Sequence, residues 1–220
     1  NASRYLKEFV EAWSRAASSW AELIVVDDGS TDETPALLET LSSAQNLICL
    51  RQDNMGPGEA RNRGLIAANA PIVAFADVDD QVNWPSLRRA AMAMRDRSDL
   101  TIDVLTDSIN RGSQRSPACR VDTSPLPLAR LRYVQGRMAV WGRLYDASLL
   151  RRIAPVFPDT RAAEDVVASV RIADSAQAFA YSHFGFYTHR AGEEQTLTKR
   201  PGYSTMALQS LSLLTEDPRP

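Results

Sequence analysis

The stretch Leu23-Ile24-Val25-Val26-Asp27-Asp28-Gly29-Ser30 joins a short apolar run to an acidic turn. Such a run is typical of a buried parallel strand that stops at the edge of a sheet. Ser30 and Glu33 have the spacing of a capping box and Pro35 suits a first helical turn, so a helix is predicted over 33–43. A strand followed at once by a helix is the repeating unit of an α/β fold.

The same alternation continues on both sides of this stretch. Apolar residues with a helical period predict a helix over 3–17, and further strands are predicted at 47–50 and 72–76, with a helix over 59–69 between them. Strand–helix–strand units are joined by right-handed crossovers, which place their strands in a parallel sheet covered by helices. We therefore predict an α/β, doubly wound, mostly parallel sheet with helices on both faces.

The second half of the chain is less regular. The segment 107–130 is rich in Ser, Pro, Arg and Gly, and a loop of this length is uncommon unless it is functional, so we interpret it as a lid or acceptor loop. The remaining predictions are helices at 85–95, 147–153 and from 164 onward, and strands at 101–106, 138–141 and 178–182. We divide the single domain into a ligand-binding half, 1–106, and a catalytic half, 107–220.

Composition excludes several classes of protein. The chain is 44% hydrophobic and 24% charged, which is typical of a soluble globular protein and not of a disordered one. A net charge of −2 provides no field that would hold a nucleic acid. No apolar run approaches the ~20 residues that span a bilayer. Cys49 and Cys119 form no CxxC motif, which favours a reducing, cytoplasmic location.

Acidic residues follow two of the predicted strands. Asp27 and Asp28 follow the first of these strands, and Asp77-Val78-Asp79-Asp80 follows the strand at 72–76. Ligands of open α/β sheets bind beyond the carboxyl ends of the strands. Carboxylates at alternate positions can converge on Mg²⁺ or Mn²⁺, which completes its coordination with water and phosphate oxygens. The pattern predicts a metal and diphosphate site.

Other interpretations of these acidic runs fit less well. A haloacid-dehalogenase-like phosphatase would need Thr or Val where Gln81 stands. A Ca²⁺-binding loop starting at Asp28 would need Gly where Glu33 stands. A nucleotidyltransferase would need a glycine-rich loop bearing Lys or Arg after its first strand, and none is visible. Solvated turn residues remain the plain alternative for either acidic run.

Several motifs together resemble one known family. The order of the motifs is similar to that of family 2 glycosyltransferases with a GT-A fold, and the similarity extends over about residues 1 to 200. The motifs are Val25-Val26-Asp27-Asp28-Gly29-Ser30-Thr31-Asp32, Gly56-Pro57-Gly58-Glu59-Ala60-Arg61-Asn62-Arg63-Gly64-Leu65, Asp77-Val78-Asp79-Asp80, Trp141-Gly142-Arg143-Leu144-Tyr145 and Glu164-Asp165.

The resemblance implies roles for the residues that match these motifs. Asp28, with Asp27 beside it, would hold the nucleotide base or ribose, and Asp79 would bind the metal, with Asp77 toward the ribose or a metal-bound water. Arg61 would lie near the nucleotide or pair with Asp27, Asp28 or Asp77, and these alternatives stay open. Asn62 is interpreted as structural. His189 would face the diphosphate, or with Arg190 form a surface pair.

The resemblance also implies a reaction. Asp165 matches the catalytic base of the family, with Glu164 orienting the loop or capping the helix. The implied activity is that of an inverting, non-processive, hexosyltransferase-like enzyme of polysaccharide biosynthesis that uses Mn²⁺ or Mg²⁺. It would transfer a sugar from a nucleoside diphosphate donor, UDP-sugar before others, to a hydroxyl of a glycan, lipid-linked or small acceptor. The alternative from another class is a catalytically silent nucleotide-sugar-binding module.

The start of the chain departs from the family pattern. Members usually open with an apolar strand ending in Pro-x-Tyr-Asn, and Asn1 resembles the last residue of that motif. We expect a preceding strand between those at 23–26 and 72–76, because its absence would leave buried backbone groups unpaired. The physical protein is then longer than this sequence. A cytoplasmic location is implied, with peripheral contact with the inner face of the membrane left open.

Overall fold

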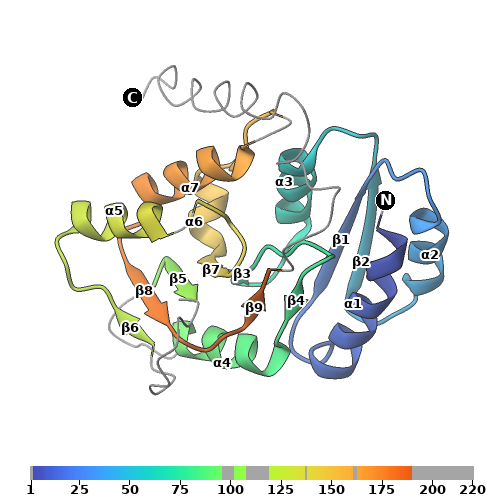
Figure 1. The fold of residues 1–220 in the computed structure, drawn as a ribbon, viewed down its shortest axis with the longest axis horizontal. Helices are drawn as coiled ribbons and strands as arrows, with labels where there is room; N and C mark the ends of the chain where they lie inside the picture. Colours follow the sequence, from blue (N-terminus) through green and yellow to red (C-terminus); the bar gives the residue numbers. More distant parts are fainter. Residues whose placement is uncertain (1, 96–101, 108–118, 137, 161–162, 190–220) are drawn as a thin grey trace.

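A computed structural model describes residues 2–95, 102–107, 119–136, 138–160 and 163–189. Helices and strands alternate through the first half of the chain (Figure 1). Their bounds are α1 Ser3–Ala16, β1 Leu23–Asp28, α2 Thr34–Leu41, β2 Leu47–Gln52, α3 Pro57–Ala67, β3 Ile72–Val73, β4 Gln81–Val82, α4 Trp84–Arg95 and β5 Val104–Asp107. Those of the second half are β6 Arg120–Val121, α5 Leu126–Gly136, β7 Arg143–Asp146, α6 Ala147–Arg152, α7 Glu164–Ser175, β8 Phe179–Ser182 and β9 Tyr187–Thr188.

The strands form three sheets in the described residues. β1 and β2 pair in parallel over six residue pairs, from Leu23 opposite Leu47 to Asp28 opposite Gln52. The largest sheet has the order β3-β7-β5-β8-β6, in which β5 and β8 are parallel and the other neighbours antiparallel. β4 and β9 form an antiparallel pair. Parallel pairs are therefore present as predicted, β1 with β2 and β5 with β8, while the other neighbours in the five-stranded sheet and the β4–β9 pair are antiparallel.

Successive side chains of the five-stranded sheet point to opposite faces. Each face packs against an apolar cluster that includes helices. Val104 and Phe179 face a cluster that includes α5, α6 and α7, whereas Leu105 and Ala180 face a cluster that includes α4. Figure 1 shows α5–α7 on one side of this sheet and α4 on the other.

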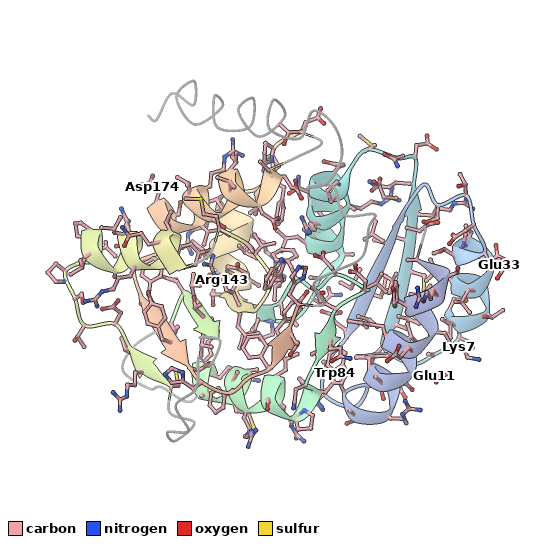
Figure 2. All side chains as sticks on the ribbon, viewed as in Figure 1. Lys7, Glu11, Glu33, Trp84, Arg143 and Asp174 are labelled. Carbon is pink, nitrogen blue, oxygen red and sulfur yellow. The ribbon has the colours of Figure 1, made fainter. Side chains whose placement is uncertain are left out.

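A third apolar cluster holds α1 and α2 against the β1–β2 pair. Trp84, at the start of α4, belongs to it and meets Phe9 of α1 edge to face, with 5.7 Å between the ring centroids. Figure 2 shows Trp84 where α4 approaches α1. This contact ties the β1–β2 layer to the helix beneath the five-stranded sheet.

Several local predictions need correction. The predicted loop at 107–130 contains β6 and the start of α5, while its part at 108–118 lies outside the described residues. The strand predicted at 138–141 is displaced to 143–146, and Trp141 instead forms an isolated bridge with Phe75. Short apolar runs do not reveal which residue begins a strand, because tertiary pairing decides it.

The expected strand between 23–26 and 72–76 has no counterpart in the described residues. β1 pairs with β2, β3 pairs with β7, and no described strand joins β1 to β3. The described helices include none that is both long enough and apolar enough to cross a membrane.

Candidate active site

Hydrogen bonds accepted by Asp28 connect the end of β1 to the loop that precedes α3. Its Oδ1 accepts hydrogen bonds from the Gln52 side chain and the Met55 backbone N–H, both at 2.8 Å, and its Oδ2 accepts the Gly56 N–H at 2.9 Å. Gly29 permits this approach, because its φ is +73° and a Cβ there would lie 2.7 Å from the Asn54 nitrogen. The turn predicted to bind the nucleotide is therefore built around Asp28.

Asp27 shapes the same turn from inside. It is 4% exposed, accepts the Ser30 N–H at 3.0 Å and faces the Arg51 guanidinium at 3.5 Å. A carboxylate that accepts a backbone N–H three residues later forms a local turn motif. Asp27 thus has the structural role that we noted as its alternative, and it supports the turn that presents Asp28.

Arg61 lies at the junction of three segments. From α3, its Nη1 donates to Glu164 and to Asp165 at the start of α7, both at 2.8 Å, and its Nη2 donates to Asp77 at 3.0 Å. Of the partners left open by the sequence, Arg61 takes Asp77 and not Asp27 or Asp28. It also brings the predicted base, Asp165, next to the second acidic turn.

Two neighbours of Arg61 let α3 approach α7 so closely. A Cβ at Gly58 would lie 3.1 Å from the Pro158 carbonyl oxygen and 3.3 Å from the Cβ of Glu164, so a larger residue would push the helices apart. Asn62 exchanges two hydrogen bonds with the backbone of Phe157, at 2.9 and 3.1 Å. Asn62 is therefore structural, as the sequence predicted.

Burial and charge give Asp165 the properties of a base that titrates near neutral pH. Burial raises its pKa to about 6, the charge of Arg61 acts in the opposite direction, and Glu164 and Asp77 raise it further. The Val140 backbone also hydrogen-bonds the carboxylate. Its side chain keeps 20% exposure, so a reactant can approach it.

Arg61 stays cationic in this position. Burial alone would lower its pKa, but the charges of Asp165, Asp77 and Glu164 outweigh burial and raise it. One guanidinium therefore offsets repulsion among three carboxylates, of which Glu164 is only 8% exposed.

The carboxylates of the turn at 77–80 suit a divalent cation. Asp77 is 39% exposed and carries one hydrogen bond from Arg61. Burial raises the pKa of Asp79, and the charges of Asp80 and Asp77 raise it further, which is the crowding of negative charge that a cation relieves. The described residues contain no preformed cluster of three or more ligands, and Mg²⁺ needs only one or two carboxylates when phosphate and water complete its shell.

His189 contacts Asp80, a residue to which we assigned no role from sequence. Its Nδ1 lies 3.0 Å from Asp80 Oδ1, and the Tyr187 hydroxyl donates to Oδ2 of the same carboxylate. Burial first, then the charge of Asp77, raises the pKa of Tyr187, so this hydroxyl stays a neutral donor. Trp141 stacks on both rings, with centroids 5.2 Å from Tyr187 and 4.9 Å from His189.

The predicted residues thus gather at one place in the fold, with one exception. Asp77, Glu164 and Asp165 share Arg61, while Asp79 and His189 adjoin the buried Asp80. Asp28 contacts Gly56, the N-cap of the helix α3 that carries Arg61, whereas Asp27 is turned inward. Asp80, Tyr187 and Trp141 were missed, because a buried partner 107 residues away leaves no local pattern.

Comparison with known proteins identifies relatives of the chain. Residues 1–154 match the model of the protein family described as Glycosyl transferase family 2. The poly(ribitol-phosphate) beta-N-acetylglucosaminyltransferase TarS of Staphylococcus aureus is 26% identical over 99% of the chain. The uncharacterized glycosyltransferase EpsJ of Bacillus subtilis is 27% identical over 91% of it. The chain spans 39% of the length of TarS and 61% of EpsJ.

Solved structures agree with the sequence comparison. The crystal structure of S. aureus TarS 1-349 in complex with UDP-GlcNAc matches 87% of the chain with a TM-score of 0.69 and 26% identity, and the match covers 57% of that structure. The UDP complex of the same protein matches 99% of the chain with a TM-score of 0.72. The predicted GT-A-type α/β fold is confirmed.

Proposed function

The chain belongs to glycosyl transferase family 2, and we propose that it transfers one sugar at a time from a UDP-sugar to an acceptor hydroxyl, with inversion at the anomeric carbon. The contacts of Arg61 carry this proposal. Its guanidinium joins Asp77, on the turn proposed for the donor, to Asp165, the proposed base, so the donor and acceptor groups converge at one point.

Asp165 would act as the general base. Its carboxylate takes the proton as the acceptor O–H bond breaks, the acceptor oxygen bonds to the anomeric carbon, and the bond from that carbon to the diphosphate oxygen breaks. A base works best when its pKa lies near the operating pH, and a pKa raised to about 6 meets this condition. Arg61 fixes the direction of the carboxylate, and Glu164 shares the same guanidinium.

We further propose that Asp79, with Asp77, holds Mn²⁺ or Mg²⁺. The metal would neutralise charge on the leaving diphosphate as a Lewis acid. The crowded carboxylates at this turn support the assignment, since their mutual repulsion favours a bound cation. His189 would face the diphosphate from the opposite strand, where Asp80 holds it.

The donor and acceptor follow from chemistry and from the relatives. A UDP-sugar is proposed because TarS, which has the same fold, is described in complex with UDP-GlcNAc. The acceptor is proposed to be a hydroxyl of a glycan or lipid-linked saccharide in polysaccharide biosynthesis. The proposed location is the cytoplasm, at or near the inner face of the membrane.

Replacement of the base tests the proposal. Asp165→Asn keeps the size of the side chain but cannot accept the proton, so sugar transfer should fall by about 10²- to 10⁴-fold. Binding of UDP, measured by calorimetry, should change by less than about threefold. Asp174→Asn is the matched control, because Asp174 lies on the same helix, is 45% exposed and pairs with Arg130. Transfer by the Asp165 variant at the wild-type rate would remove the base assignment.

A second experiment separates the enzyme from a silent binding module. Thermal unfolding is followed with UDP-, GDP- and dTDP-sugars, with Mn²⁺ and after chelation, because a ligand that binds only the folded state raises the melting temperature. The proposal expects stabilisation by the uridine donor that chelation abolishes, accompanied by metal-dependent hydrolysis or transfer. Stabilisation without any turnover would favour the silent module.

A further inference from the structure

Asp80 carries the most deeply buried carboxylate of the 77–80 turn. It also contacts other candidate site residues. Its side chain is 1% exposed, whereas that of Asp77 is 39% exposed. Both of its oxygens are engaged, Oδ1 by His189 Nδ1 at 3.0 Å and Oδ2 by the Tyr187 hydroxyl, with His189 Nδ1 also within 3.2 Å of Oδ2. A carboxylate so enclosed is suited to orient side chains and not to bind a ligand itself.

Strand pairing explains how Asp80 reaches residues so far along the chain. β4 and β9 are antiparallel, with Gln81 opposite Thr188 and Val82 opposite Tyr187. Continuing this register by one pair places Asp80 opposite His189. The Tyr187 hydroxyl also accepts the Asp77 N–H at 3.2 Å, so β9 is hydrogen-bonded to both ends of the acidic turn.

The contact with Nδ1 selects one edge of the imidazole. Carboxylate oxygens accept hydrogen bonds, so this contact assigns a proton to Nδ1 of His189, and the other ring nitrogen, Nε2, is directed away from Asp80. A diphosphate oxygen also only accepts, so Nε2 can bind it only as a second N–H donor of the protonated ring. The His189 side chain is 43% exposed although its Asp80 partner is buried. Trp141, stacked on the imidazole at an interplanar angle of 20°, restrains the plane of the ring.

The ring lies beside the proposed donor turn. The charge of His189 lowers the pKa of Asp79, against larger effects of burial, Asp80 and Asp77 that raise it. His189 is therefore within electrostatic reach of the carboxylate proposed to hold the metal.

We propose that Asp80 is a positioning residue that acts through His189, fixing its imidazole so that Nε2–H donates to the diphosphate of the nucleotide donor. This inference rests on the proposed function of the same site. Such outer partners of a ligand-binding histidine set its tautomer and its orientation, and their loss commonly lowers affinity 10- to 100-fold.

A double-mutant cycle on the full chain tests the proposal. UDP and UMP binding are measured by calorimetry with Mg²⁺ for Asp80→Ala, His189→Ala and the double variant. Each single variant should weaken UDP binding about tenfold and UMP binding less than twofold, because UMP lacks the second phosphate. The double variant should bind UDP no more weakly than His189→Ala, since Asp80 acts only through the ring.

Two controls sharpen the cycle. Asp80→Asn keeps an oxygen that can accept the Nδ1 proton, so UDP affinity should return to within about threefold of wild type. His183→Ala removes the exposed second histidine of the chain and should leave UDP binding unchanged. The inference would be overturned if the fold-losses in UDP affinity of the two single variants multiply in the double variant. Equal losses of affinity for UMP and UDP would also overturn it.

Nuclear magnetic resonance keeps the proposal testable even where Asp80→Ala does not fold. In the wild-type chain labelled with nitrogen-15, Nδ1 of His189 should carry a proton, and UDP with Mg²⁺ should shift the Nε2 resonance toward that of a protonated nitrogen while UMP should not. An Nδ1 without a proton, or an Nε2 signal that UDP leaves in place, rejects it. Absence of UDP binding to the wild type would instead reject the proposed function, and with it this inference.

Discussion

The two acidic turns look alike in sequence and differ in structure. Each follows an apolar strand and carries consecutive or alternating aspartates. At the first turn, the carboxylates of Asp27 and Asp28 accept mainly from backbone N–H groups, such as those of Ser30 and Gly56. At the second turn, Asp77 and Asp80 contact side chains from other elements, namely Arg61, Tyr187 and His189.

Aspartate therefore has two different roles in the two turns. A carboxylate that accepts backbone N–H groups fixes the path of the chain, because these donors cannot move without moving the turn. A carboxylate that faces a guanidinium or an imidazole joins elements that are distant in sequence, and its charge-assisted hydrogen bonds orient the side chains of those elements. The first turn is thus predicted to matter chiefly for local structure and the second chiefly for activity.

Arg61→Ala should have the largest effect on the second turn. It leaves Glu164, 8% exposed, and the partly buried Asp165 without their shared cation, and breaking a buried pair costs about 3–5 kcal/mol. Transfer should fall at least about 100-fold, because the base loses its orientation. Urea unfolding and initial rates measure the two effects.

Arg61→Lys refines this prediction. Lysine retains the charge but lacks the planar fork that reaches three carboxylates, so stability should recover more than the rate does. Full recovery of the rate would show that only the charge of Arg61 matters and would contradict its orienting role.

The pH dependence of transfer should reveal Asp165 directly. Since burial raises its pKa to about 6, the carboxylate is protonated below that pH and cannot accept the acceptor proton. The value of kcat should decrease about tenfold per pH unit below 6 and level off above it. A profile flat from pH 5 to pH 8 would contradict the assignment, provided that chemistry limits the rate.

Stability should change with pH in the opposite direction. The folded-state pKa of Asp165 lies above its usual 3.8, so between those values the folded chain binds more protons than the unfolded chain. The contribution to stability is complete below about pH 3.8 and is lost as pH rises through about 6. The unfolding free energy of the wild type relative to Asp165→Asn should therefore decrease from pH 4 to pH 7, as chemical denaturation at each pH measures.

Asp28→Ala should disturb the first turn by a smaller amount. It removes an acceptor from the Met55 and Gly56 N–H groups and from Gln52, and each unsatisfied buried donor costs about 1–3 kcal/mol, less where water can replace the lost partner. Hydrogen exchange at Gly56 should accelerate, while the pH dependence of kcat should keep its midpoint near 6. A shifted midpoint would show that the two turns are coupled.

Arg51→Ala should have the smallest effect. Its side chain is 62% exposed and lies 3.5 Å from Asp27, and ion pairs with an exposed partner contribute about 0–1 kcal/mol. Thermal unfolding should change little and transfer should stay within about twofold of wild type. A loss comparable to that of Arg61→Ala would erase the contrast between the two turns.

Much of the first half of the fold could be predicted from sequence. The helices α1, α2 and α3 and the strands β1 and β2 lie within a few residues of the predicted ranges, because apolar periodicity and local breakers govern them. The second half was harder, since β6 and β9 have two residues each and exist only through pairing with distant strands. Helix α5 was obscured by the prolines at its start, Pro125 and Pro127.

Amino-acid order alone determined that acidic groups follow apolar strands, because a strand end and the turn after it depend on a few adjacent residues. Only the tertiary structure decided that Arg61 binds carboxylates 103 and 104 residues away and that Asp80 contacts His189. Those pairs form when α3 packs on α7 and β4 pairs with β9, and no local pattern encodes the energy of such long-range packing.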